Sequence, residues 1–214
     1  AVMLFDSRRE DTERSTWREA IKRALVTQFD AALVAGTPQR KYAVELGIPD
    51  DAVFTPFDVV DNAHFAEPSL GVSPEQRWGF LTVARLAPVK NLDGLLAAYT
   101  QYREHADDPW PLSIVGDGPE RAALEQAAPP GVTFVGHVGL NDIPSWYRRA
   151  GAVVLPSHKD TWGLVVNEAM ASGLPVLVSN GAGCAVDLVD EGVNGYRCSP
   201  DDTDELAKHL STIA

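Results

Sequence analysis

The sequence predicts an α/β protein in which a doubly wound parallel sheet is preceded by a partial second α/β lobe. The first observation behind this prediction is a regular alternation of short apolar runs with helical segments over residues 78–200. Such alternation is typical of parallel sheets, because each strand needs a crossover helix before the next strand. A shorter alternation covers residues 1–57, and residues 58–77 form a linker with proline and glycine but no helical or strand period.

Composition restricts the class of protein. The 214 residues carry a net charge of −12, which argues against nucleic acid or an anionic membrane as the main partner. Cys184 and Cys198 form no framework of spacings, so we expect two reduced thiols in a cytoplasmic protein. No apolar run approaches the roughly 18 residues of a membrane span, although peripheral binding at the inner face of the membrane stays open.

The first lobe, residues 1–57, is expected to hold half of a parallel sheet. Strands are predicted at Val2–Phe5, Ala31–Val34 and Ala52–Pro56, and helices over Ser15–Gln28 and Pro38–Leu46. Gly47 suits the left-handed conformation that ends a helix. Because the chain begins directly in a predicted buried strand, we expect it to start inside a longer protein.

The second lobe, residues 78–200, is expected to be complete, and residues 201–214 add a C-terminal helix capped by Asp201 or Asp202. Its strands are predicted at Gly79–Ala84, Leu112–Val115, Val132–Val135, Gly151–Pro156, Val176–Ser179 and Tyr196–Cys198. One helix is predicted after Asn91, which we expect to be its N-cap, and another is predicted to start near Gly163. Further helices are predicted over Glu120–Gln126, Asp142–Arg149 and Ala185–Val189.

The stretch Leu155–Val178 carries the strongest functional signal. A strand leads into a short polar loop with Asp160, and the helix that begins near Gly163 contains Glu168. Both carboxylates can face the crevice above the strand ends, where open parallel sheets bind ligands. The free backbone N–H groups at the start of this helix suit an anion such as a phosphate.

Two cations follow the first strand of the second lobe. Arg85 and Lys90 lie in the loop between that strand and its helix. A guanidinium and an ammonium that converge there suit a diphosphate, and can stabilise the negative charge on a departing diphosphate. The alternative is two surface charges near acids such as Asp93, but basic residues are scarce in this part of the chain, which favours function.

The remaining loops carry weaker signals. Gly116 opens the segment Gly116–Pro119, which either lets a ligand approach the backbone closely or forms a tight turn before a helix. His137 and His158 follow strands, where a lone histidine is more often a surface or core residue than a catalytic one. Gly181–Gly183 superficially looks like a dinucleotide fingerprint, but it follows the last full strand and lacks the third small residue, so we reject a nicotinamide or flavin site.

Several loops together resemble one family. Phe80–Leu96 is similar to the opening of the nucleotide-sugar domain of family-4 (group 1) glycosyltransferases with the GT-B fold, whose C-terminal lobe is Rossmann-like. Leu112–Pro119, Val132–Val138 and Leu155–Val178 resemble the later signature blocks in order and spacing. Val60–Phe65 resembles the linker between the two GT-B lobes, which makes residues before it the end of the N-terminal, acceptor-side lobe.

This resemblance implies transfer of a sugar from a nucleotide diphosphate sugar to an acceptor, with retention at the anomeric carbon and no obligatory metal or cofactor. The donor would be a UDP-, GDP- or ADP-sugar, and the acceptor a sugar, a lipid-linked or another small molecule. The resemblance places Arg85 and Lys90 on the donor diphosphate, and Glu168 on the ribose hydroxyls. The residues implied to hold phosphate and base through their backbone are Gly163, Leu164, Val165 and Val138.

The sequence departs from the family pattern in two ways. Asp160 stands where the family has a glutamate near the donor sugar, and Trp162 follows as the usual aromatic residue. The family's acceptor site belongs to an early part of the N-terminal lobe that this chain lacks. We therefore expect a fragment that binds a donor but transfers poorly or not at all. A truncated sheet should expose an apolar edge, through which a homodimer or the missing N-terminal part can pair.

Two alternative functions stay open. One is a different GT-B enzyme, such as a nucleotide-sugar epimerase or a phosphorylase, although no pyridoxal lysine motif is evident. The other is a non-catalytic domain that binds a sugar nucleotide or acts as a scaffold. The presence of Arg85, Lys90 and Glu168 weakens this second alternative.

Overall fold

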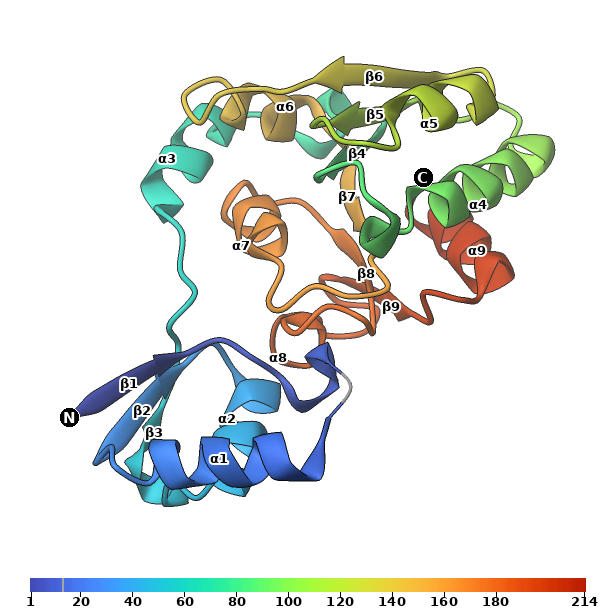
Figure 1. Ribbon diagram of the computed structural model, residues 1–214. Coiled ribbons are helices and arrows are strands. Elements are labelled where there is room, and N and C mark those ends of the chain that lie inside the picture. The colour runs from blue at the N-terminus through green and yellow to red at the C-terminus, as the bar shows by residue number, and fades with distance from the viewer. Residues whose placement is uncertain (13) are drawn as a thin grey trace.

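The structure is a computed structural model that describes residues 1–12 and 14–214 (Figure 1). Its strands form a three-stranded sheet and a six-stranded sheet, called the small and the large sheet below. Neighbouring strands pair in parallel throughout both sheets. The predicted α/β class with a doubly wound sheet and a second, smaller α/β lobe is confirmed.

The small sheet contains β1 (Val2–Phe5), β2 (Ala31–Val34) and β3 (Val53–Phe54), in that order. Helices α1 (Thr16–Val26) and α2 (Thr37–Glu45) connect these strands. The third strand is shorter than predicted, because Pro56 has no N–H with which to extend the ladder. Gly47 has a φ of +110°, which confirms the left-handed end of the second helix.

The small sheet and its first helix expose large apolar side chains. Strand β1 lies at the sheet edge, next to the N-terminus (Figure 1). The large apolar side chains of β1 and α1 that are between 52% and 63% exposed are Val2, Leu4, Trp17, Ile21 and Leu25. The sequence predicted an exposed apolar edge in this lobe. Formation of a homodimer through this edge stays a prediction.

The segment between the sheets is more regular than predicted. It contains the helix α3 (Asn62–Ala66) and two short 3-10 turns, Glu67–Ser69 and Pro74–Gln76. The carboxylate of Asp61 starts α3, because it accepts hydrogen bonds from the backbone N–H groups of Ala63 (3.0 Å) and His64 (3.2 Å). A helix of five residues is too short to show a period in sequence, which explains why it was missed.

The large sheet has the strand order β6-β5-β4-β7-β8-β9. The strands are β4 (Phe80–Val83), β5 (Leu112–Val115), β6 (Val132–Gly136), β7 (Ala152–Leu155), β8 (Val176–Ser179) and β9 (Gly195–Cys198). The helices are α4 (Leu92–His105), α5 (Arg121–Ala127), α6 (Pro144–Arg149), α7 (Leu164–Ala171), α8 (Ala185–Leu188) and α9 (Thr203–Ile213). Alternate residues of the strands enter two separate apolar clusters, so the large sheet is buried on both faces.

Two predicted helix caps have different outcomes. Asp202 caps α9 as expected, and its carboxylate accepts a hydrogen bond from the N–H of Glu205 at 2.9 Å. Asn91 stands at the N-cap position of α4 as expected, but its side chain makes no capping hydrogen bond. Its amide instead donates to the carbonyl oxygens of Pro156 (3.1 Å) and Pro200 (2.7 Å), which ties the loops after β4, β7 and β9 together.

Candidate functional site

The carboxyl ends of β4 and β7 form the crevice of the large sheet. From β4 the chain winds outward through β5 and β6, and then returns to β7 on the other side of β4. Doubly wound sheets bind ligands where the winding direction reverses in this way. A cavity of about 470 Å³ lies there, called the switch-point cavity below. Its lining comes from both sheets and includes Arg85, Lys90, Asp160, Asp6 and Asp58.

The two predicted cations do converge in this cavity. The ammonium of Lys90 lies 2.6 Å from a carboxylate oxygen of Asp160, and the two side chains are 21% and 18% exposed. Arg85 lines the same cavity. The ion pair joins the loop after β4 to the loop after β7, so strands far apart in sequence contribute to one charged site.

The start of α7 also faces the switch-point cavity, since Gly163, Leu164 and Val165 line it. Gly163 has a φ of +103°, and a Cβ there would lie 2.8 Å from a methyl carbon of Leu155. Glycine therefore allows the loop to turn tightly into the helix. The N–H groups in the first turn of a helix have no intrahelical acceptor, so they can donate to an anion in the cavity.

Glu168 lies beside this cavity rather than in its lining. It follows Leu164 by one helical turn on the same face of α7, about 6 Å further along the axis. The hydroxyl of Tyr147 donates a hydrogen bond to the carboxylate of Glu168. Burial raises the pKa of Glu168, and the hydrogen bond from Tyr147 and the charge of His64 partly offset this rise.

The two remaining candidates are Val138 and Gly116, which lie in the loops after β6 and β5. Val138 packs against the same apolar cluster as Val165, on the α7 side of the large sheet. The ring nitrogen Nε2 of His64 lies 2.9 Å from the carbonyl oxygen of Leu140, which holds the loop after β6 in place. A Cβ on Gly116 would lie 1.9 Å from the carbonyl oxygen of Ala84, so this glycine allows close packing against the Arg85 loop.

Sequence reasoning missed Asp6 and Asp58, which line the switch-point cavity from the small-sheet side. Among the described residues, the Oδ1 atom of Asp6 is buried without a hydrogen-bond partner. Burial, followed by the negative charge of Asp58, raises the pKa of Asp6 to about 7. Asp6 directly follows a strand, so the rule that singled out the strand ends of the large sheet would have found it.

Asp6 should make the stability of the protein depend on pH. Its folded pKa of about 7 exceeds the ordinary value of 3.8, so the folded state binds more protons between these values. Stability should therefore fall as pH rises from about 4 to 7. Between pH 4.5 and 7.5, the free energy of unfolding of wild type is expected to fall by about 1–2 kcal/mol relative to that of Asp6→Asn, after allowance for solvent screening. Urea unfolding measures this loss, and Asp51→Asn, at an exposed position, is the control. Parallel pH profiles of unfolding free energy for wild type and Asp6→Asn would contradict the prediction.

Direct contacts fix the small sheet against the large one. The amide of Gln39 donates to the carbonyl oxygen of Thr161 at 2.7 Å, and the N–H of Thr37 donates to Asp187 at 2.7 Å. A Cβ on Gly36 would lie 2.4 Å from the ring of Trp162, so only glycine admits the indole at this place. Trp162 itself lines the switch-point cavity, where sequence reasoning placed an aromatic residue.

The cysteines and the helices bear on two further expectations. Cys184 and Cys198 are buried free thiols, and burial raises the pKa of each to about 12. Such thiols are poor nucleophiles. Along the described chain, none of the helices combines the length and apolarity that crossing a bilayer requires.

A doubly wound parallel sheet of six strands that faces a second parallel sheet of three matches the GT-B class of fold. Residues 77–214 match the family described as glycosyl transferases group 1, and the chain belongs to this family. The fold class and the family therefore agree with the resemblance seen in the sequence.

Named relatives share the sequence over most of this chain. Glycogen synthase of Mycobacterium tuberculosis is 30% identical over 202 residues, which cover 91% of this chain and 48% of that protein. D-inositol 3-phosphate glycosyltransferase of Salinispora arenicola is 33% identical over 206 residues, covering 88% and 44%. The crystal structure of Anabaena HepE in complex with UDP has a TM-score of 0.76 at 21% identity, covering 99% of this chain and 61% of that one. This chain thus spans less than half the length of the glycogen synthase and of the D-inositol 3-phosphate glycosyltransferase.

Proposed function

We propose that the chain supplies the donor half of a retaining glycosyltransferase and binds a nucleotide diphosphate sugar in the switch-point cavity. The observation that carries this proposal is the convergence of Arg85, Lys90 and the first turn of α7 on one cavity. Two cationic side chains and free N–H groups match the charge and the acceptors of a diphosphate. UDP in the related HepE structure and the group 1 family support the same ligand class.

The same groups suit the chemical step. Breaking the bond between the anomeric carbon and the diphosphate leaves negative charge on the departing oxygen. Arg85 and Lys90 can stabilise that charge because they are already placed at the cavity wall. Lys90 uses one of its three N–H donors for Asp160, so the others remain for phosphate oxygens. Asp160 would stand near the donor sugar, with a side chain one methylene shorter than the family's glutamate.

The nucleoside would extend from the diphosphate along α7. We assign the ribose hydroxyls to Glu168 and the base to the backbone at Val138, which lies on the same side of the large sheet. On this view residues 78–200 bind the donor, residues 58–77 link the lobes, and residues 1–57 form part of the acceptor side. The helix of residues 201–214 completes the chain's packing against α4.

Calorimetric titration of the chain with UDP, GDP and ADP, followed by their sugar conjugates, tests this proposal. One nucleotide is expected to bind with a dissociation constant of about 10–100 μM, or roughly 5.5–7 kcal/mol. No binding of any of the three at millimolar concentration would contradict it.

The same chain is expected to transfer sugar poorly, since it spans less than half the length of the curated enzymes it matches. An assay of the 214-residue chain for sugar transfer tests this part separately. Turnover at the rate of a complete glycosyltransferase would contradict it.

A further inference from the structure

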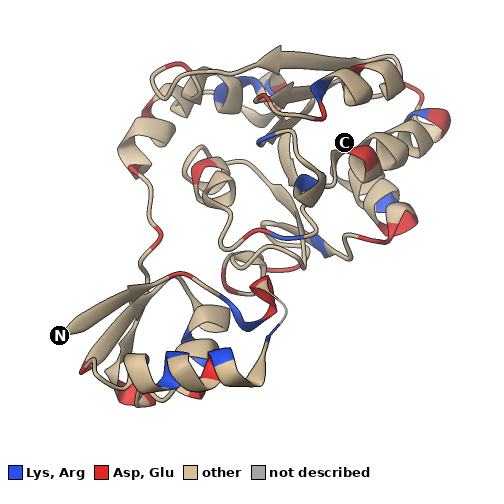
Figure 2. Ribbon diagram, in the orientation of Figure 1, with Lys and Arg blue, Asp and Glu red and all other residues tan. Residues whose placement is uncertain are grey.

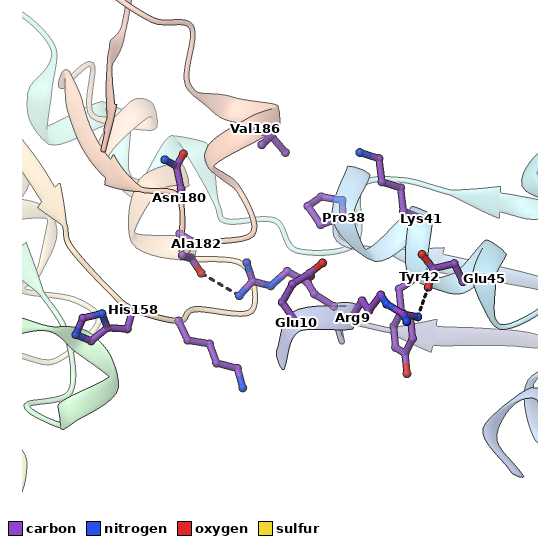
Figure 3. A pocket seen from close by; sticks show the side chains of 13 residues that line it. Arg9, Glu10, Pro38, Lys41, Tyr42, Glu45, His158, Asn180, Ala182 and Val186 are labelled. Carbon is purple, nitrogen blue, oxygen red and sulfur yellow. Dashed lines mark hydrogen bonds and ion pairs between the residues drawn. The ribbon is translucent and has the colours of Figure 1, made fainter. Parts of the chain in front are cut away.

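A second cavity, of about 360 Å³, lies between the two sheets. It forms where the end of β1 and the helix α2 meet the loops after β7 and β8, and it is called the basic cavity below. In Figure 3, Pro38 and Lys41 come from α2, and Asn180 and Ala182 face them from the large-sheet side. A volume of this size accommodates a small phosphorylated molecule.

The basic cavity and the switch-point cavity share a wall. His158 and Lys159 line the basic cavity, while the next residues, Asp160 to Trp162, line the switch-point cavity. The end of β1 divides in the same way, because Asp6 lines the switch-point cavity and Arg8 the basic one. A molecule in the basic cavity would therefore lie next to the place proposed for the donor sugar.

The charge of the basic cavity is opposite to that of the chain. Arg8, Arg9, Lys41 and Lys159 line it, against only two carboxylates, Glu10 and Glu45. The whole chain has 18 lysines and arginines against 30 aspartates and glutamates. Basic segments occur on both sides of the interface between the sheets (Figure 2). A local excess of cations in an acidic protein attracts anions to this place.

Two of these cations are occupied in holding the structure. The Arg8 side chain is only 7% exposed, and its guanidinium lies 3.1 Å from Asp11 and 2.9 Å from the carbonyl oxygen of Gly181. Arg9 pairs with Glu45 at 2.6 Å (Figure 3). Among the described residues, Lys41 and Lys159 have no acidic partner, so their ammonium groups are the ones left for a ligand.

We propose that the basic cavity binds a phosphate group of the acceptor through Lys41 and Lys159, and so holds a phosphorylated acceptor beside the donor sugar. This inference rests on the proposed function, because it takes the switch-point cavity as the donor site. The two lysines come from opposite sides of the cavity, one from α2 and one from the loop after β7. Both lysines line this cavity, so the ammonium group of each can donate hydrogen bonds to a phosphate bound in it.

Titration with inorganic phosphate, followed by NMR on the full 214-residue chain, tests the inference. The chain is first saturated with the nucleoside diphosphate that binds among UDP, GDP and ADP, so that the diphosphate site is filled, and constant ionic strength is kept with chloride. Saturable shifts are expected at Lys41, Lys159 and Gly181. Lys159→Gln and Lys41→Gln should each raise the phosphate dissociation constant about fivefold. The nucleotide affinity should change less than twofold, and the exposed Lys208→Gln should leave both constants unchanged.

Phosphate shifts that do not saturate, or constants unaffected by Lys41→Gln and Lys159→Gln, would overturn the inference. A second experiment distinguishes failure of this inference from failure of the proposed donor site. If none of UDP, GDP and ADP binds, the same phosphate titration is run on Lys90→Ala, in which the diphosphate site is weakened. Saturation at Lys41 and Lys159 in that variant would retain the anion site without a donor site, and its absence would reject the anion site as well.

Discussion

Lys90→Ala is expected to weaken binding of the preferred nucleoside diphosphate by about 30- to 100-fold, equivalent to about 2–3 kcal/mol. The substitution removes a charge-assisted hydrogen bond to phosphate. It also leaves the carboxylate of Asp160, only 18% exposed, without its cation partner 2.6 Å away. An unpaired carboxylate in the cavity wall repels the diphosphate, so the two effects act in the same direction. Calorimetry with the purified variant measures the change.

Two further variants separate these effects. Lys90→Ala combined with Asp160→Asn removes the repulsive charge and should recover part of the lost affinity, which a double-mutant cycle quantifies. Lys208→Ala, on the exposed side of α9, controls for the loss of one positive charge from the chain. An affinity for Lys90→Ala within threefold of wild type would remove Lys90 from the proposed diphosphate site.

Glu168→Gln is expected to lower affinity for the nucleoside diphosphate about 10- to 30-fold and to leave affinity for inorganic pyrophosphate within twofold of wild type. The reason for the difference is that pyrophosphate has no ribose. Glutamine keeps the size of the side chain and can still accept the hydrogen bond from Tyr147. The comparison therefore isolates the loss of the carboxylate as an acceptor for two ribose hydroxyls.

Tyr147→Phe is the matched control for the surroundings of Glu168. It removes the hydroxyl that bonds to this carboxylate but takes no proposed contact from the ligand. Its effect on nucleotide affinity should be smaller than that of Glu168→Gln. Equal losses for nucleotide and pyrophosphate in Glu168→Gln would show that Glu168 acts through the fold. Nucleotide binding that ignores both Lys90→Ala and Glu168→Gln would favour a scaffold function over a donor site.

The charged part of the candidate site follows from sequence by a simple rule. In a parallel sheet all strands end at the same edge, so residues that follow strands gather there wherever the strands come in the chain. The rule predicts that Arg85, Lys90 and Asp160 lie together, and all three line the switch-point cavity. The rule applies equally to Asp6, which directly follows β1.

Other features have no local signal. The Tyr147 hydroxyl bound to Glu168 depends on how α6 and α7 pack, and in sequence Tyr147 is an ordinary core aromatic residue. Asn91 has the sequence position of a helix cap, yet two carbonyl oxygens from distant loops compete for its amide and decide its role. Helix α3 depends on one capping carboxylate and is too short for periodicity.

The sequence by itself determined the α/β class, the strand positions and the loops that hold the cations, because periodicity and turn residues act over a few neighbours. The tertiary structure alone decided what faces those loops across the interface. Asp6 reaches the switch-point cavity, and Lys41 and Lys159 line one cavity, only because Gln39 and Gly36 seat the small sheet against the large one. Contacts between sheets join residues more than a hundred positions apart, and no local pattern encodes that separation.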